Sequence, residues 1–193
     1  DLLQDQSRGG AVTLMDHQRD VGERAAHLAN ALGLPALSTA ALSAAGCHHD
    51  DGKSDGEWQL QLGHASGQVL AKSPKRISSA RRRQLVTSLP TGWRHEQLSV
   101  VLAWEDLPPE IRALAARLIG TSHGHGRMVF PHGSADLIRE GHAHLPELAH
   151  ELFDLGAWDE LIDQTDREWG VWGAAYLEAV LRAADVQISK EGR

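Results

Sequence analysis

Residues 36–53 read ALSTAALSAAGCHHDDGK, and this stretch decides the fold. Its first part is mostly Ala and Leu, the strongest intrinsic helix formers. We therefore predict a helix from Ala36 to about Asp51 that ends at Gly52. The helix finishes in a cluster of histidines and aspartates, which can converge on one cavity if the helix end faces it. Imidazole and carboxylate together suit Mn, Fe, Co, Ni or Zn, so the cluster is a candidate metal site. The alternative interpretation is a polar helix end exposed to solvent.

The rest of the chain is also predicted to be helical. Apolar residues recur at helical spacing along most of it, and Ala and Leu dominate the apolar set. No segment indicates a strand, so the predicted fold class is all-α. The further helices are expected at Thr13–Leu32, Arg94–Glu105, Glu110–Ile119, Leu145–Leu155, Trp158–Asp166 and Trp169–Lys190.

A chain of 193 residues fits one compact domain. Residues 1–11 are polar and are interpreted as a linker or tail, which leaves 12–193 as a single domain. Residues 53–92 are rich in Ser and Gly and are predicted to form a basic, loop-rich insertion with a short helix at about 79–87. The glycine-rich stretch 120–141 is predicted to be a loop.

The charge of the chain is uneven. Its net charge is −7, which does not indicate a nucleic-acid-binding protein as a whole. The segment 72–83, however, carries six basic residues and no acidic one. Such a segment is able to follow a phosphate backbone, although it also fits a solvated insertion. The candidate DNA-binding residues are Lys72, Lys75, Arg76, Arg81, Arg82 and Arg83.

The cysteine content and the apolar runs indicate the compartment. Cys47 is the single cysteine, so an internal disulfide is excluded and a reducing compartment is favoured. No apolar run approaches the roughly 20 residues of a membrane helix. The first residues lack the basic and apolar regions of a signal peptide. We expect a cytoplasmic protein that does not enter a membrane.

Further candidate metal ligands lie on or beside other predicted helices. His17 lies in the first helix, His95 opens a later one, and His123 lies in the glycine-rich loop. Asp185 follows an apolar stretch of the last helix, and carboxylates are seldom buried without a partner or a metal. Taken singly, each histidine also has a simpler interpretation. His17 could lie on the surface of its helix. His95 could lie at a helix start, where the negative charge of Glu96 favours the positive end of the helix dipole.

Taken in order, these ligands resemble the HD superfamily of metal-dependent phosphohydrolases. The series is His17, His49-Asp50, His95, His123 and Asp185. The segments HHDDGKSD, RHEQLSVVLA, GTSHGHGRMVFPH and GAAYLEAVLRAADVQISKEG look specifically like the HD nuclease domain of the CRISPR type I helicase–nuclease. They are most similar to the variant branch in which the HD domain follows the helicase. The resemblance spans residues 13–190.

The resemblance implies an all-α HD-domain helical bundle with one or two divalent transition-metal ions, Mn, Ni, Co or Fe, with Mg as a further option. The first ion would be held by His17, His49, Asp50 and Asp185. The second would be held by His95 and His123, with Asp50 bridging. Many relatives carry two adjacent histidines in the glycine-rich loop, whereas here Ser122 precedes His123, so Ser122 or His125 is expected to compensate.

The same resemblance implies endonucleolytic cleavage of single-stranded DNA in CRISPR interference, an antiviral defence. Asp50 would share its carboxylate between the ions, while Lys53 would neutralise charge on the phosphate and Arg127 would assist from the loop. The expected partners are single-stranded DNA, a helicase domain in the same full-length chain and a CRISPR RNA-guided surveillance complex. Residue 1 is Asp and not Met, as expected of an excised C-terminal domain.

Two other functions stay open. An HD phosphohydrolase acting on nucleotides would use a single metal held by His17, His49, Asp50 and Asp185, without the remaining histidines. A non-catalytic helical module would bind a structural metal or none. Structural zinc sites usually include cysteine ligands, and the chain has one cysteine, so this second option ranks last.

Overall fold

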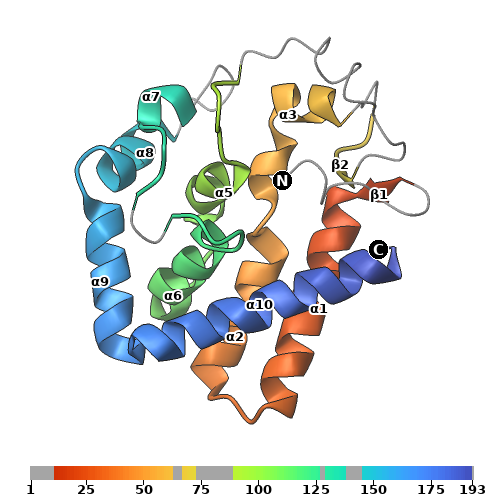
Figure 1. Cartoon of the computed structure of the whole chain (residues 1–193), viewed down its shortest axis with the longest axis vertical. Helices are drawn as coiled ribbons and strands as arrows, with labels where there is room; N and C mark the ends of the chain where they lie inside the picture. The colour runs from red at the N-terminus through yellow and green to blue at the C-terminus, as the bar shows by residue number, and fades with distance from the viewer. Residues whose placement is uncertain (1–10, 63–66, 73–88, 127–128, 138–144, 193) are drawn as a thin grey trace.

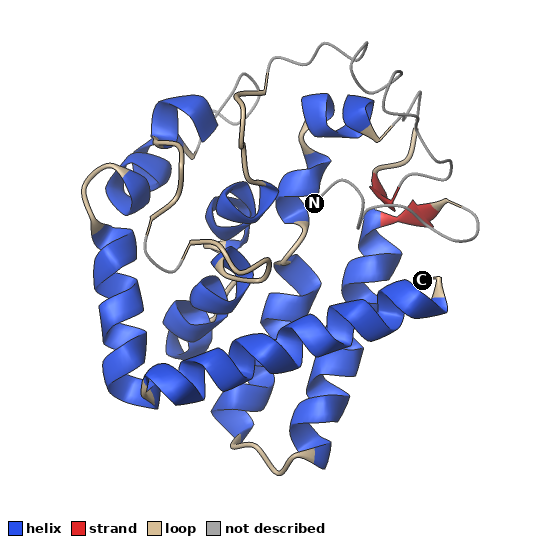
Figure 2. Cartoon of the chain, in the orientation of Figure 1, coloured by secondary structure: helices blue, strands red, loops and turns tan. Residues whose placement is uncertain are grey.

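The computed structural model describes residues 11–62, 67–72, 89–126, 129–137 and 145–192. These residues are mostly helical, with one short antiparallel sheet (Figure 2). The predicted all-α fold class is therefore confirmed. The elements are β1 (Val12–Thr13), α1 (Leu14–Ala31), α2 (Ala36–His48), the 3₁₀ helix η1 (Asp51–Ser54), α3 (Gly56–Gln61), β2 (Leu70–Lys72), α5 (His95–Ala103), α6 (Pro109–Gly120), α7 (Ser134–Leu137), α8 (Pro146–Phe153), α9 (Ala157–Trp169) and α10 (Val171–Glu191).

Helices α1 and α2 form an antiparallel pair joined by a short turn (Figure 1). Gly33 in this turn has a φ of 69°, which favours glycine. The helices approach closely at Gly22 and Gly46, where a Cβ on Gly46 would lie 2.7 Å from the Cα of Gly22. This close approach brings His17 of α1 beside the C-terminal end of α2, where His49 follows.

The long helix α10 lies across α1, α2 and α6 (Figure 1). A buried ion-pair network fixes its direction. The Arg117 side chain of α6 donates from Nε to Glu178 of α10 at 3.2 Å and from Nη1 to Asp166 of α9 at 2.6 Å. Asp185 lies two turns beyond Glu178, so the same network determines where Asp185 faces the rest of the bundle.

The core lies between these helices and is made mainly of alanine and branched aliphatic side chains. Fully buried members come from α1, α2, α5, α6 and α10, namely Val21, Ala25, Leu42, Ala45, Leu98, Leu118, Ile119, Leu181 and Ala184. Within the described residues, no helix combines the length and the apolar character that crossing a membrane requires.

The segment after α2 differs from its prediction. The helix stops at His48, because Asp50 leaves helical geometry with φ −110° and ψ 7°, and a 3₁₀ turn follows. Residues 56–61, which were predicted to lie in a loop-rich insertion, form α3. The Asp55 carboxylate caps this helix by accepting hydrogen bonds from two backbone N–H groups, and Trp58 is buried beneath it.

The prediction that the chain contains no strand is wrong. β2 returns from the insertion to pair with β1, with Val12 opposite Lys72 and Thr13 opposite Leu70. Such short strands carry too little alternation to be recognised from a sequence. Helix α7 also lies inside the stretch predicted as a loop. The short helix predicted at about 79–87 falls outside the described residues.

Replacing Gly46 with alanine should destabilise the protein. A Cβ at this position meets three backbone atoms of α1 at 2.7–3.0 Å, which cannot move independently. We expect Gly46→Ala to lower the free energy of unfolding in urea by about 1–3 kcal/mol. The matched control is Gly173→Ala in α10, whose nearest contact is 3.9 Å away. It should raise that free energy by up to about 1 kcal/mol through helix propensity. Equal effects of the two variants would contradict the close approach of α1 and α2.

Candidate metal centre

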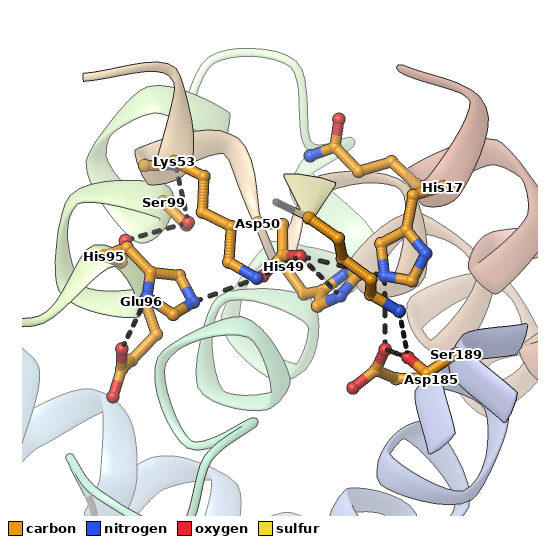
Figure 3. Close-up of polar contacts among 12 residues, drawn as sticks. His17, His49, Asp50, Lys53, His95, Glu96, Ser99, Asp185 and Ser189 are labelled. Carbon is orange, nitrogen blue, oxygen red and sulfur yellow. Dashed lines mark hydrogen bonds and ion pairs between the residues drawn. The ribbon is translucent and has the colours of Figure 1, made fainter. Parts of the chain in front are cut away.

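The candidate ligands converge in two adjacent groups of three. His17, His49 and Asp185 form the first, which we call site A, and Asp50, His95 and His123 form the second, site B. In each group the three potential ligand atoms lie within 4.8 Å of one another. Figure 3 shows the side chains of His17, His49, Asp50 and His95 pointing toward one region, with Asp185 approaching from α10.

Site A joins three helices. Nε2 of His17 in α1 lies 3.2 Å from Oδ1 of Asp185 in α10. The His17 ring also faces that of His49 at the end of α2, with centroids 5.6 Å apart. Burial alone would raise the pKa of Asp185, but the hydrogen bond from His17 and the electrostatic interaction with the His49 ring hold it well below its usual range. Asp185 is therefore an ionised carboxylate at neutral pH.

A backbone carbonyl determines the tautomer of His49. Its Nδ1 lies 2.9 Å from the carbonyl oxygen of Gly46, so Nδ1 carries the proton and donates it. Nε2 is then left with a lone pair directed into the site. Burial lowers the pKa of His49, which keeps the ring neutral. This is the state in which imidazole binds a metal.

Asp50 lies between the two sites and faces both. Its Oδ1 lies 3.2 Å from Nε2 of His95, and its Oδ2 lies 3.4 Å from Nε2 of His49 and 3.8 Å from Nε2 of His17. The ammonium of Lys53 lies 2.9 Å from the same Oδ2. Burial would raise the pKa of Asp50, but the electrostatic interactions with the His49 ring and the Lys53 ammonium, and the hydrogen bond from His95, hold it well below its usual range.

In site B, two imidazoles point their Nε2 atoms at each other. Nε2 of His95 and Nε2 of His123 are 3.1 Å apart, and their ring centroids are 4.9 Å apart. Burial lowers the pKa of His123 well below its usual value, and the neighbouring His95 lowers it further. A neutral His123 and an ionised Asp50 are thus the forms present near pH 7, and both can act as ligands.

A glycine and a serine hold His95 opposite Asp50. A Cβ on Gly52 would lie 2.0 Å from the carbonyl oxygen of His95, so only glycine fits between η1 and α5. The Gly52 N–H donates to Ser99 Oγ at 2.8 Å, and Ser99 Oγ donates to that His95 carbonyl at 2.9 Å (Figure 3). Gly52 was predicted to end the helix. Its role in the structure is instead to permit this close contact between η1 and α5.

The loop that carries His123 is held at both ends. Thr121 accepts a backbone hydrogen bond from Gly124 at 2.8 Å, which closes a tight turn around His123. Further along, the indole N–H of Trp158 donates to the carbonyl oxygen of Gly126 at 2.6 Å. These contacts fix the loop against α6 and α9, so His123 reaches site B from an ordered segment.

The residues present fit a divalent metal ion. Imidazole nitrogens and carboxylate oxygens are the donors that transition metals prefer. Nε2 of His49 is buried and has no hydrogen-bond partner among the described residues, and an unsatisfied buried polar atom costs about 1–3 kcal/mol. Asp50 is 1% exposed, whereas the Asp185 side chain is 24% exposed, so Asp185 is the more accessible of the two carboxylates.

The remaining predicted residues lie in different surroundings. Ser122 is buried, and its hydroxyl has no hydrogen bond within the described residues. His125 is exposed and belongs to neither site. Lys72, expected on an exposed DNA-binding segment, is instead 4% exposed because β2 places it against α10, and its ammonium donates to Ser189. The predicted residues Lys75, Arg76, Arg81, Arg82, Arg83 and Arg127 lie outside the described residues.

Three residues lie near the centre that the sequence did not predict to be there. Glu96 is completely buried, with Oε2 3.6 Å from Nδ1 of His95 (Figure 3). Ser189 donates to Asp185 at 3.0 Å. Arg182 is exposed one turn before Asp185, and its Nη1 lies 3.9 Å from the position of a Cβ on Gly124. Of these three residues, only Ser189 could have been recognised from the sequence, because a serine four residues after an aspartate on a helix lies beside it.

Comparison of the chain with protein-family models, with curated proteins and with solved structures finds no match.

Metal titration should distinguish the two sites. We expect metal-stripped protein to bind two Mn²⁺ or Co²⁺ ions in isothermal titration calorimetry, and to unfold at a higher temperature with metal than with chelator. His123→Ala should lose one ion, and Asp50→Ala, which removes the carboxylate between the sites, should weaken both. His27→Ala replaces an exposed histidine of α1 and should bind as wild type does. Weaker metal binding by the His27→Ala control, or unchanged affinity at both sites in Asp50→Ala, would contradict these assignments.

Proposed function

We propose that this protein hydrolyses phosphodiester bonds of single-stranded DNA with divalent transition-metal ions, of which Mn, Ni, Co and Fe suit the donor set. One observation carries the proposal: two sets of ligands lie side by side and share the Asp50 carboxylate. His17, His49 and Asp185 would hold one ion and His95 and His123 the other, with Asp50 between them. Mg²⁺ is a poorer match, because it prefers oxygen ligands and water.

Metal ions so held supply Lewis acidity, lower the pKa of a water and orient the scissile phosphate. The chain's own residues prepare the site. His49 and His123 stay neutral because burial lowers their pKa, and Asp50 and Asp185 stay ionised. Lys53 is buried with its ammonium on Asp50, so its first role is to keep that carboxylate charged and in place. A phosphate oxygen that entered beside Asp50 would meet the same ammonium.

Two features favour a polynucleotide substrate over a mononucleotide, namely the second set of candidate ligands and Arg182. A one-metal phosphohydrolase of nucleotides needs His17, His49, Asp50 and Asp185, but it has no use for His95 and His123 converging on Asp50. Arg182 is exposed beside the loop that carries His123, and it lies one helical turn before the partly exposed Asp185. A guanidinium there suits a neighbouring phosphate of the same strand.

The biological setting that we propose follows the resemblance of the sequence to HD nuclease domains. In it, a helicase domain of the same full-length chain and a CRISPR RNA-guided complex deliver single-stranded DNA during antiviral defence. The net charge of −7 supports this arrangement, because the domain on its own would bind DNA weakly and a partner would have to present the strand.

Cleavage of circular single-stranded DNA tests the proposal. We expect metal-stripped protein to open the circle when Mn²⁺, Co²⁺ or Ni²⁺ is added, with products followed on a denaturing gel. Asp50→Ala should abolish cleavage, and His123→Ala should reduce it at least 100-fold, on the order of the effect of losing a charge-stabilising group. Arg182→Ala should raise KM with little change in kcat, since it would remove binding to a phosphate that does not react.

The exposed His27 serves as the control, because His27→Ala changes a histidine of α1 outside the centre. An intact circle in the presence of each metal, with phosphate released from mononucleotides, would favour the one-metal nucleotide phosphohydrolase. In that case His123→Ala should leave phosphate release unchanged. If neither DNA nor nucleotides are hydrolysed, the enzymatic proposal is wrong.

A further inference from the structure

A buried lysine from the insertion contacts site A through a serine. Lys72 lies at the end of β2 and is 4% exposed. Its ammonium donates a hydrogen bond to Oγ of Ser189 in α10. Ser189 Oγ in turn donates to Oδ1 of Asp185 at 3.0 Å, and that same oxygen lies 3.2 Å from Nε2 of His17. The chain of contacts therefore ends on a carboxylate of the candidate metal centre (Figure 3).

The chemistry of the lysine sets the direction of this chain. An ammonium group only donates hydrogen bonds, so the Ser189 oxygen accepts from Lys72 and its own proton is directed to Asp185. A serine hydroxyl without such a neighbour rotates among several partners. Lys72 thus selects the rotamer in which Ser189 holds the Asp185 carboxylate, and the carboxylate keeps its remaining lone pairs for site A.

The strand that carries Lys72 is itself held firmly. Lys72 pairs with Val12 of β1, directly before the helix that bears His17. The Gln59 side chain donates to the carbonyl oxygen of Leu70 at 2.9 Å and accepts from its N–H at 2.9 Å, which ties β2 to α3. Leu14 donates from its backbone to Val69 at 2.8 Å. These bonds hold β2 in place, so the fold itself positions the Lys72 ammonium beside Ser189.

We propose that Lys72 is a positioning residue of site A, which fixes the Asp185 carboxylate through Ser189 and makes β2 a structural part of the metal centre. This inference rests on the proposed function. It also reassigns a residue that sequence analysis placed among the DNA-binding positions. Outer groups that hydrogen-bond a ligating carboxylate typically contribute about 10–100-fold in metal affinity.

A positioning role and a simple charge effect of Lys72 would change the metal affinity in opposite directions. As a positioning residue, Lys72 strengthens binding at site A, and its loss weakens binding. As a mere positive charge near the site, it would repel a divalent cation, and its loss would strengthen binding. The direction of the change therefore separates the two roles.

The experiment measures Mn²⁺ affinity by isothermal titration calorimetry on metal-stripped protein in which His123→Ala leaves site A alone. We expect Lys72→Met and Ser189→Ala each to weaken binding at least tenfold. The double variant should be about as weak as either single one, because both act on the same hydrogen-bond chain. Lys72→Arg, which keeps a donating cation, should recover part of the affinity.

Lys190→Met is the matched control, since Lys190 follows Ser189 on α10 but is exposed. It should leave the Mn²⁺ affinity of site A unchanged. In a second control, made in the His17→Ala background, Lys72→Met should leave the Mn²⁺ affinity of site B unchanged. If Lys72→Met fails to fold, Ser189→Ala and Lys72→Arg decide the question. Unchanged or tighter binding in Ser189→Ala and Lys72→Met would overturn the positioning role. Absence of binding in the wild-type protein would instead overturn the metal centre itself, and this inference with it.

Discussion

The carboxylate of Asp50, buried among histidines and paired with Lys53, is the constraint on which the rest of this structure depends. An ionised carboxylate that is 1% exposed survives only if charge and hydrogen bonds surround it. Lys53 supplies the charge at 2.9 Å, and His95 supplies a contact at 3.2 Å on the opposite oxygen. Each oxygen therefore faces a different group of candidate ligands, and both groups take their position from Asp50.

The helical bundle can be understood as the support for this arrangement. The glycine contact between α1 and α2 brings His17 beside His49, and Gly52 allows η1 to lie directly against His95. The buried Arg117 network sets the direction of α10 and therefore the place of Asp185. Close packing, and not local sequence, brings candidate ligands spread over most of the chain into one compact cluster.

The all-α class and the residue types of the candidate ligands could be predicted from the sequence, because Ala- and Leu-rich helices and histidine–aspartate clusters are visible locally. The partners that hold the ligands could not. Lys72 and Ser189 are 117 residues apart, and nothing near Lys72 indicates that a three-residue strand returns to the start of α1. Gly52 resembled a helix stop, since a tight contact with His95 leaves no mark in sequence. Glu96 resembled a helix-start residue, yet it is completely buried.

Anomalous X-ray scattering from crystals grown with Mn²⁺ and measured at the manganese absorption edge tests the central claim most directly. We expect two peaks, one enclosed by His17, His49 and Asp185 and the other by Asp50, His95 and His123. Asp50 should lie between the two peaks, with one oxygen toward each. Peaks at other positions would contradict a metal centre built around Asp50. The absence of any peak, in crystals in which these side chains are arranged as described, would contradict it as well.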